Sequence, residues 1–400
     1  TDPEFGIENH TELFLLVTKM PERTCQFRRN PGGLNDNLVY LDKRYSDLRV
    51  SSYSSSLKII AAIDDRHHVG LGDKVNILIK KGVLTDARKA ARFLHSLQVS
   101  RQLGKLCSAF PTLVDIMMTP SPGHDVNVVF APNFTSRLDI YVDSTFRLSD
   151  RFIALMMYQT LNGLKYMHSA GICHTRLRPK CCLVTQRLRV CITGFEYTGI
   201  IGESMDHYTD LSPFDTAFQS PEWLCRNRYL HGETDTWSLG VIMATLLLKD
   251  FGFPSNNFGH QMDRIMDCCG LPAGSNVEWV ENENIKAKLL HEYRARSSQQ
   301  RRSTLRTIFS HVSAGALDLL EKLLVVDPNR RLSAHEALQH DHFNGDFGNI
   351  FLPSDKPFVD RRYWETNGGF SISATEAKRE LKRMILEGFY IPDKAGEVSS

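Results

Sequence analysis

The side chains best suited to chemistry lie in four short stretches of the sequence. In chain order these stretches are His174–Leu183, Gly194–Glu196, Ser220–Glu222 and Asp235–Gly240. The first starts with the imidazole of His174 and continues with two arginines, a lysine and two cysteines, but it has no carboxylate. Because an arginine keeps its proton in a protein, this stretch offers fixed positive charges and thiols rather than a carboxylate base.

The order and spacing of the four stretches resemble those of the catalytic loop, the metal loop, the Pro-Glu motif and the buried central helix of protein kinases. The resemblance extends over residues 75–343. It implies a bilobal α+β fold, with a small β-rich N-lobe and a larger, mainly helical C-lobe. The residues that match the family's shaping and packing positions are His174, Phe195, Glu222, Asp235 and Arg331.

The same resemblance places departures at each position that handles a proton or a metal. Arg176 occupies the place of the Asp that accepts the substrate proton, and Cys181 that of the Asn that binds magnesium. In the metal loop, Gly194 replaces the Asp and Glu196 replaces the Gly. A guanidinium cannot accept a proton, and magnesium prefers hard oxygen ligands, which neither a thiol nor a glycine supplies. We therefore expect no catalytic residue and no metal site at these degenerate positions.

The strand that would carry a phosphate-pairing lysine is predicted at Val75–Lys80, because apolar residues alternate there with polar ones. The resemblance makes Lys80 a vestige of that lysine, with Lys81 or an ordinary edge-strand lysine as the alternatives. No glycine-rich turn precedes the strand, and no glutamate occurs between Thr24 and Phe195 to pair with the lysine. The phosphates of a nucleotide therefore have no evident cradle, and no cofactor is expected to bind.

Helical and strand periodicities predict the elements that position these residues. Strands are expected at 57–63 and 126–130, and helices at 85–106, 150–168, 263–269 and 374–387. Thr85 or Asp86 is suited to cap the first of these helices, and Ser149 the second. The last is a charged amphipathic helix with an apolar stripe through Leu381 and Met384, and we expect it to pack on the large lobe.

Composition and charge are those of a soluble, folded protein. Of the 400 residues, 42% are hydrophobic, and the formal net charge is +2 without a basic tail, so nucleic acid is not an expected partner. The longest apolar run, Trp237–Leu248, is too short to cross a bilayer, and no transmembrane segment is expected.

The resemblance and the composition together predict four segments. Residues 1–5 are interpreted as a cloning remnant, 6–131 as an N-lobe with a divergent N-terminal extension and no Gly-rich loop, 132–347 as the C-lobe, and 348–400 as a C-terminal extension with the amphipathic helix. The chain is expected to begin inside a longer precursor, so the lack of a signal peptide carries no information.

Two further expectations come from the resemblance to the kinase large lobe. In that lobe the arginine of the final helices pairs with the Pro-Glu glutamate, which implies a largely buried ion pair between Glu222 and Arg331. Cys225 would lie close to Cys268 and Cys269, so a disulfide from Cys225 to one of these two is left open. Such a bond would suit a secretory compartment.

Residues that shape the large lobe are thus retained, whereas residues that handle the proton, the metal and the phosphates are replaced. This selective loss favours a pseudokinase, a catalytically inactive kinase homologue that works as a scaffold or an allosteric binding partner. The His-Thr catalytic loop and Thr193–Glu196 resemble those of the secreted rhoptry-type kinases of coccidian parasites, and the missing loop resembles their with-no-Gly-loop branch. That resemblance alone implies secretion into the parasitophorous vacuole or cyst wall and protein partners among other secreted parasite proteins.

Two other functions remain open on the sequence. A divergent kinase with a displaced catalytic carboxylate would use one of four acids, Glu196, Glu203, Asp206 or Asp210. A metal-independent nucleotide sensor would instead neutralise phosphates with Lys80, Arg176 and Arg178.

Overall fold

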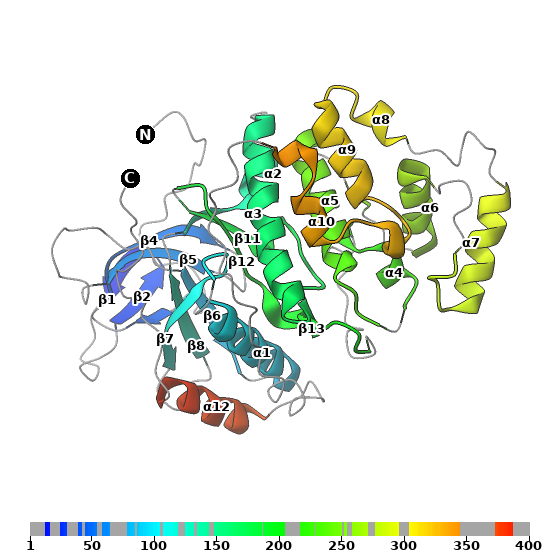
Figure 1. Ribbon diagram of the computed structural model, residues 1–400. Helices are drawn as coiled ribbons and strands as arrows, with labels where there is room; N and C mark the ends of the chain where they lie inside the picture. Colours follow the sequence, from blue (N-terminus) through cyan, green and yellow to red (C-terminus); the bar gives the residue numbers. More distant parts are fainter. Residues whose placement is uncertain are drawn as a thin grey trace. The chain divides into compact units, whose positions relative to one another are not determined.

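The computed structural model divides into two compact units (Figure 1). Unit 1 comprises residues 1–94, 112–136 and 371–400, and unit 2 comprises residues 95–111 and 137–370. The described residues are 78–84, 86–104, 107–118, 125–131, 134–143, 148–185, 187–204, 217–227, 229–249, 252–253, 258–270, 277–295, 304–344 and 373–386, preceded by the backbone of five strands between residues 13 and 64. The expected remnant at 1–5 lies outside them.

Unit 1 contains an antiparallel five-stranded sheet with the strand order β4-β5-β6-β8-β7. Its strands are β4 (Tyr45–Tyr53), β5 (Lys58–Asp64), β6 (Leu78–Val83), β7 (Thr112–Met118) and β8 (Asp125–Ala131). β8 lies between two neighbours and is buried from Val126 to Phe130, as its apolar run predicts. A second sheet consists of β1 (Leu13–Leu16), β2 (Cys25–Arg29) and β3 (Val39–Leu41).

The strand expected at residues 75–80 continues beyond its expected end to Val83, and residues 75–77 lie outside the described part of the chain. β6 pairs with β8 from Leu78, opposite Phe130, to Val83, opposite Asp125. Alternation of apolar residues identifies a strand, but its ends depend on where a neighbour offers hydrogen-bond partners, which the pattern of one strand does not contain.

Helix α1 (Ala87–Gly104) follows β6, close to its expected range. Asp86 caps the helix, since the N–H of Lys89 donates to its Oδ1 atom at 2.9 Å. Phe93 of the helix lies directly on Gly82 of β6, where an added Cβ would be only 2.5 Å from Cζ of the ring. Glycine is therefore the residue that permits this close approach of α1 to the sheet.

The tail helix α12 (Ala374–Leu386) forms where it is expected, but it belongs to unit 1 and packs on β7. The prediction that it packs on the large lobe is wrong. Its stripe of Ala377, Leu381 and Met384 is buried, as the helical spacing requires. An amphipathic pattern identifies the buried face of a helix without identifying the surface that covers it.

Unit 2 is mainly helical, and the chain enters it within β9 (Phe134–Arg137). Its helices are α2 (Leu138–Asp143), α3 (Asp150–Ser169), α4 (Pro221–Leu224), α5 (Glu233–Leu248), α6 (Phe258–Cys269), α7 (Glu283–Ala295), α8 (Leu305–Ile308), α9 (Ala314–Leu323) and α10 (Ala334–Leu338). Ser149 caps α3 by accepting the N–H of Phe152 at 3.2 Å. α6 begins before the expected Asp263 and ends at the expected Gly270, whose φ is 70°.

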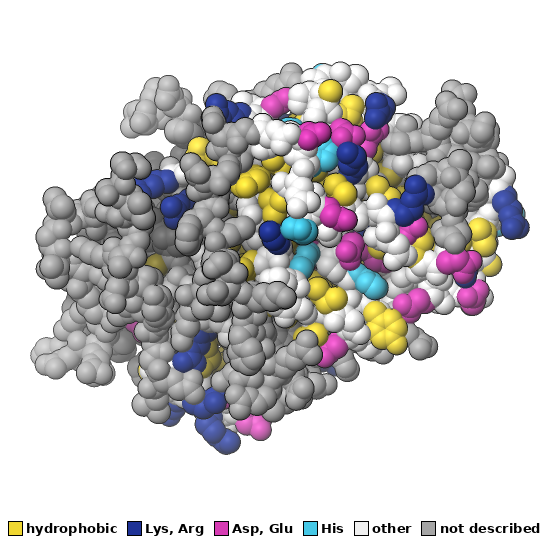
Figure 2. Space-filling view, viewed as in Figure 1, with side chains coloured by type: hydrophobic (Ala, Val, Ile, Leu, Met, Phe, Trp, Pro, Cys, Tyr) yellow, Lys and Arg dark blue, Asp and Glu magenta, His cyan; other side chains and the backbone are white. Residues whose placement is uncertain are grey.

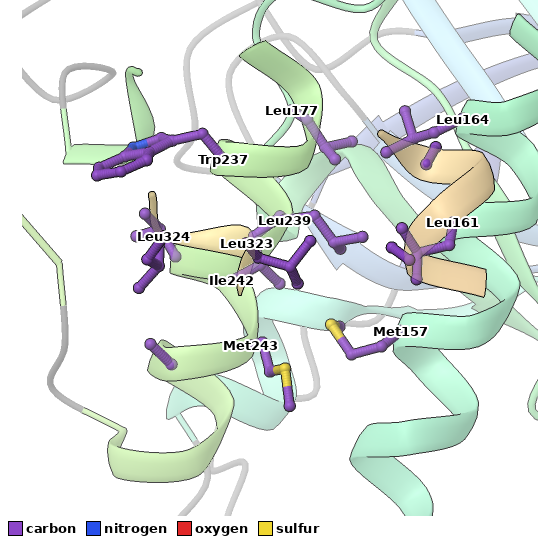
Figure 3. Packing of buried hydrophobic residues seen from close by; sticks show 14 of the residues in the cluster. Met157, Leu161, Leu164, Leu177, Trp237, Leu239, Ile242, Met243, Leu323 and Leu324 are labelled. Atoms are coloured by element: carbon purple, nitrogen blue, oxygen red, sulfur yellow. The ribbon is translucent and has the colours of Figure 1, made fainter. Parts of the chain in front are cut away.

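The core of unit 2 forms around α5, which is buried along nearly its whole length. α3 and α9 both pack against it. Figure 3 shows Leu239 and Met243 of α5 facing Leu161 and Met157 of α3, with Leu323 of α9 beside Ile242. A helix that is apolar on all sides needs such neighbours around it, and α5 is the rigid element from which the loops described below are held.

The surface of unit 2 mixes side chains of both signs. On the face shown in Figure 2, acidic, basic and histidine side chains are interspersed. The exposed large hydrophobic residues among those described are Ile140, Leu188, Tyr229 and Ile308, which come from different elements. In the described parts of the chain, no helix has both the length and the apolar character needed to cross a membrane.

Candidate functional site

Two pairs of short antiparallel strands frame the loop that starts at His174. β10 (Ile172–Cys173) pairs with β13 (Gly199–Ile200), and β11 (Cys182–Thr185) pairs with β12 (Val190–Ile192). The first loop therefore runs from β10 to β11, and the loop that contains Gly194 runs from β12 to β13. The N–H of Thr193 donates to the carbonyl oxygen of Cys181 at 2.8 Å, so the two loops lie side by side.

Asp235, in the first turn of α5, holds the backbone of the first loop. Its buried carboxylate accepts the N–H groups of His174 at 2.7 Å and of Thr175 at 2.8 Å. Nε2 of His168, at the end of α3, lies 2.9 Å from the same carboxylate. Thr175 has a φ of 67°, and its hydroxyl donates to the carbonyl oxygen of Tyr197 at 2.6 Å. These bonds hold the loop in a left-handed conformation that would otherwise be strained.

The side chain at the expected position of the catalytic base is a stacked cation. Cζ of Arg176 lies 3.3 Å from the centroid of the Tyr197 ring, which is a close cation–π contact. Tyr197 follows the metal-loop motif directly, so the contact joins the two loops through their side chains. The guanidinium carries a positive charge and can donate hydrogen bonds here, but it cannot accept a proton.

Gly194 brings the second loop against Cys181. Its φ is 91°, and a Cβ added to it would lie 2.9 Å from Sγ of Cys181 and 3.8 Å from Oε2 of Glu196. A side chain at this position would press on the thiol and would also adopt a backbone conformation that favours glycine. Sulfur therefore fills the space into which an aspartate of the metal loop would extend.

His174 and Cys181 form a buried pair at the junction of the two loops. Nε2 of His174 lies 2.9 Å from the carbonyl oxygen of Thr193, and Sγ of Cys181 lies 3.6 Å from that of Arg176. Burial would lower the pKa of His174, but the hydrogen bond and charge of Cys181 raise it to about 8. Burial would raise the pKa of Cys181, but His174 and then Arg178 bring it below its usual value.

Phe195 is fully buried and connects the second loop to the core. Its ring centroid lies 5.7 Å from that of His174 and 6.1 Å from that of Phe110. Phe110 in turn lies 5.9 Å from Tyr166 of α3. This row of rings gives His174 and Phe195 a packing function in unit 2.

The predicted ion pair between Glu222 and Arg331 is formed. Two parallel bonds of 2.8 and 2.9 Å join the guanidinium to the carboxylate, and both side chains are almost completely buried. The hydroxyl of Thr234 on α5 donates to the same carboxylate at 3.0 Å, and Cζ of Arg331 lies 5.0 Å from the Trp237 ring centroid. Burial would raise the pKa of Glu222, but the charge and hydrogen bonds of Arg331 bring it below its usual value.

Lys80 lies in β6, opposite Val128 of β8. Its Nζ atom is 5.7 Å from the centroid of the Phe93 ring on α1. α1 therefore presents an aromatic ring toward this lysine, and the helix contains no glutamate. The side chain of Lys81, the alternative lysine, lies outside the described residues.

The remaining candidate residues divide between described and undescribed parts of the chain. Glu196 lies beside Gly194, whereas Glu203 is exposed after β13. Asp206 and Asp210 lie outside the described residues. Arg176 and Arg178 line a cavity of about 10 Å³ together with Gln219, whose buried amide makes no hydrogen bond within the described parts. This cavity has room for a single water molecule.

Comparison with known protein families assigns the chain to one of them. Residues 78–343, well over half of the chain, match the family described as "Protein kinase domain". The chain belongs to the protein kinase family. The match includes the loops around His174 and Gly194, the Glu222–Arg331 pair and Lys80, so each position discussed above lies within the kinase domain.

Several curated protein kinases show distant sequence similarity to this chain. Mitogen-activated protein kinase 3 of Arabidopsis thaliana is 29% identical over 218 residues, which cover 54% of this chain and 55% of that protein. Mitogen-activated protein kinase pmk-1 of Caenorhabditis elegans is 28% identical over 254 residues, covering 62% and 65%. Mitogen-activated protein kinase hog-1 of Neurospora crassa is 25% identical over 334 residues, covering 80% and 88%. The chain thus spans less than two thirds of the length of the first two relatives.

The metal positions of this kinase homologue do not fit magnesium. Active protein kinases bind the ion through the Asn of the catalytic loop and the Asp of the metal loop. Here those positions hold the thiol of Cys181 and the bare backbone of Gly194. Magnesium needs oxygen ligands in near-octahedral geometry, and the sulfur occupies the space where one ligand would stand. Within the described residues, no cluster of three or more His, Cys, Asp or Glu side chains is placed to hold a metal ion.

The disulfide that the sequence left open is not formed. Cys225, Cys268 and Cys269 are all free thiols, although α4, which Cys225 follows, packs on α6. Burial raises the pKa of Cys225, whereas the pKa of Cys268 is lowered by its hydrogen bond with Cys269. Cys225 and Cys268 are part of the hydrophobic core of unit 2, where they act as small apolar side chains.

Two residues of the site were not singled out from the sequence, Tyr197 and His168. Tyr197 stacks on Arg176, and His168 binds the carboxylate of Asp235. An aromatic residue directly after Gly194–Glu196 is a visible signal, but it becomes meaningful only when a cation from another loop lies within reach. His168 gave a weaker signal, because its partner is far away in the chain.

Proposed function

We propose that this member of the protein kinase family is a pseudokinase, a catalytically inactive kinase fold that serves as a scaffold or an allosteric binding partner for other proteins. The observation that carries the proposal is the contact between the two loops, where the thiol of Cys181 occupies the space in front of Gly194. The metal site of the family then lacks both an oxygen ligand and the room for one.

Arg176, at the expected position of the residue that accepts the substrate proton, supports the same proposal. Loss of a positioned general base alone lowers the rate by about 10²–10⁴-fold. A guanidinium about 4 Å from a divalent cation would add several kcal/mol of repulsion at an effective dielectric constant near 20. Its stacking on Tyr197 keeps the guanidinium at the catalytic loop.

The parts of the fold that do no chemistry support a binding function. The bonds of Asp235 to the catalytic loop and the Glu222–Arg331 pair are short and buried. A kinase fold without the chemical residues but with these bonds keeps a rigid surface, and a rigid surface suits a protein partner.

The finer part of the proposal rests on resemblance alone. The His-Thr loop, Thr193–Glu196 and the missing glycine loop resemble the with-no-Gly-loop branch of the secreted rhoptry-type kinases of coccidian parasites, most of all its bradyzoite pseudokinase. The protein would then be secreted into the parasitophorous vacuole or the cyst wall, and its partners would be other secreted parasite proteins. The relatives reported above are named as mitogen-activated protein kinases, and their activity is not carried over to Arg176 and Gly194.

Phosphoryl transfer tests the central part of the proposal. The full chain is incubated with γ-labelled ATP, magnesium and a generic protein substrate, beside an Arg176→Ala variant prepared in the same way. We expect the same background incorporation in both samples. Incorporation that exceeds the variant and grows with protein concentration would contradict the proposal and favour a displaced carboxylate, which Glu196→Gln and Glu203→Gln would then identify.

A nucleotide sensor is the second candidate, because the loop that contains Arg176 and Arg178 has no acidic residue. Such a sensor would bind phosphates through guanidinium groups without a metal. Thermal-shift titration with ATP, with and without magnesium, separates the two functions, because a ligand above its Kd raises the melting temperature. A magnesium-independent shift that Arg178→Ala abolishes would favour the sensor, and an unchanged melting temperature would favour the scaffold.

A further inference from the structure

A small cavity within unit 2 joins three segments of the chain. These segments are the first loop, the residues just before the Pro-Glu motif, and α5. The volume of the cavity is about 10 Å³, and its lining consists of Thr175, Arg176, Leu177, Arg178, Phe218, Gln219 and Ser238. Gln219 is buried, whereas Arg176 and Arg178 are partly exposed. The cavity therefore has a buried floor and a rim that reaches the surface.

The amide of Gln219 is the clearest sign that a guest binds in this cavity. The residue is 6% exposed, and neither Nε2 nor Oε1 of its side chain makes a hydrogen bond within the described parts of the chain. Folded proteins pair nearly all of their buried polar groups with protein atoms, ordered water or an ion. The cavity is thus expected to hold a guest to which Nε2 of Gln219 donates.

The hydroxyl groups of the lining are already engaged. The hydroxyl of Thr175 donates to the carbonyl oxygen of Tyr197 at 2.6 Å, and that of Ser238 donates to the carbonyl oxygen of Phe218 at 2.8 Å. The groups that can donate to a guest are therefore the N–H groups of the amide and of the two guanidiniums. A guanidinium has five N–H donors, so it can bind a guest beside its other partners.

The charge of the lining favours an anion over water. The seven lining residues include two arginines and no acid. The nearby carboxylate of Asp235 accepts backbone N–H groups of the first loop instead. Two cations that line one cavity repel each other, and the repulsion is stronger where water is largely excluded. A monovalent anion between them offsets this repulsion and accepts hydrogen bonds from both guanidiniums and the amide.

The volume restricts the kind of anion that fits. A cavity of about 10 Å³ holds one guest of the size of a water molecule. A monatomic ion meets this limit, whereas a phosphate group or a carboxylate exceeds it. Chloride is the monatomic anion that is abundant in biological fluids.

We propose that this cavity is a chloride site, in which the amide of Gln219 and the guanidiniums of Arg176 and Arg178 hold one ion. The ion offsets positive charge at the position where active kinases have an aspartate. It also links the first loop to the residues before the Pro-Glu motif, so its binding stabilises unit 2. The site involves neither the metal position nor phosphoryl transfer, and the inference is therefore independent of the proposed function.

Bromide locates the ion directly, because it replaces chloride and scatters anomalously. Crystals of the full chain are soaked in sodium bromide, and anomalous difference maps are calculated from data collected at the bromine absorption edge. We expect a bromide peak in the cavity, within hydrogen-bond distance of Nε2 of Gln219. Water alone in the cavity, or bromide at other places only, would overturn the inference.

Thermal unfolding tests binding in solution. Sodium chloride is titrated against sodium gluconate at constant ionic strength, because gluconate is too large for the cavity. At a chloride concentration about tenfold above the Kd, the melting temperature should be about 2–4 °C higher than in gluconate alone. A melting temperature that stays constant along the titration would contradict a chloride site.

A pair of variants assigns the chloride effect to the cavity. Gln219→Leu removes the amide at similar side-chain volume, so the rise in melting temperature should disappear. Gln339→Leu is the matched control, because Gln339 is exposed and does not line the cavity, and it should keep the rise of the wild type. An equal rise in both variants would overturn the inference. If Gln219→Leu does not fold, the bromide map of the native chain decides the question alone.

Discussion

Under the proposed function, Cys181 and Gly194 stand at the positions of the two metal ligands of active kinases, and their close contact links one change to the other. The sulfur fits only because Gly194 has no side chain, and Gly194 tolerates a φ of 91° for the same reason. Restoring an aspartate at position 194 would therefore create a collision instead of a metal site. At the scale of single residues, the proposed loss of the metal site depends on the packing of Cys181 against Gly194.

The contact between Gly194 and Cys181 predicts how much a single added methyl group at position 194 lowers the stability of the protein. Gly194→Ala places a Cβ 2.9 Å from Sγ, and we expect it to lower the free energy of unfolding by about 1–3 kcal/mol beyond the cost of the positive φ alone. Gly202→Ala is the matched control, since Gly202 has a φ of 88° and nothing lies within 4 Å of its added Cβ. Urea unfolding of both variants measures the difference, and equal destabilisation would contradict the packing described for Cys181.

The Glu222–Arg331 pair shows how the elements of unit 2 are joined. Glu222 lies in α4, Thr234 on α5 donates to it, and Arg331 follows α9 in the chain. Three segments thus meet at one buried carboxylate. Its loss would leave a buried guanidinium without its charged partner, which is costlier than the loss of a surface pair.

Substitution at this pair is expected to destabilise the fold strongly. Glu222→Gln should lower the free energy of unfolding by about 3–5 kcal/mol. The control is Glu321→Gln, which removes the partner of the exposed Arg306 and should cost less than about 1 kcal/mol. Similar losses in both variants would contradict the importance assigned to the buried pair.

The same pair gives a pH dependence with a defined sign. The pKa of Glu222 is lowered in the folded state, so its carboxylate adds stability above the unfolded pKa of about 4.3, and this stability is lost as the pH falls through the folded pKa. Wild type and Glu222→Gln should therefore converge in free energy of unfolding below about pH 4. A constant difference down to acid pH would show that the carboxylate does not titrate as described.

His95, near the middle of α1, ties the part of this helix that belongs to unit 2 to the second loop. Its Nε2 atom lies 2.9 Å from the carbonyl oxygen of Thr198, and burial lowers its pKa against the effects of Thr198 and Glu196. The folded state thus holds a neutral imidazole. Stability from this residue is complete above the unfolded pKa of about 6.5 and decreases as the pH falls below it.

The contribution of His95 is tested by comparing how the stabilities of wild type and His95→Gln change with pH. Between about pH 7 and pH 5, wild type should lose stability that His95→Gln does not lose, because glutamine can still donate to Thr198 but does not titrate. Thermal unfolding at several pH values measures both curves. Parallel curves would mean that His95 is not buried in its neutral form.

At the scale of the whole molecule, the predicted class of fold is confirmed by the family match, whereas the contacts within the fold were harder to predict from the sequence. α3 was predictable because Ser149 and an apolar helical spacing lie together in the chain. The side on which α12 packs was not, because its stripe fits any apolar surface. The contact of Gly194 with Cys181 depends on a φ angle and on two loops that meet in space, and neither can be deduced from residue types.

The domain match explains which predictions came from the family. The buried Glu222–Arg331 pair follows from a kinase-wide pattern, so it could be predicted from two motifs far apart in the sequence. Tyr197 on Arg176 could not, because it accompanies a substitution that active kinases do not have at that position. Contacts at positions that depart from the family pattern are therefore the ones that only the structure reveals.

The central claim is that the catalytic and metal loops of this kinase-family chain cannot hold magnesium beside a nucleotide. Crystals of the full chain soaked with ATP and magnesium test it most directly, because they show the site itself. We predict that no metal ion will be bound between Cys181 and Gly194, whether or not nucleotide is present elsewhere. An ordered triphosphate with an octahedral magnesium ion at that place would contradict the claim.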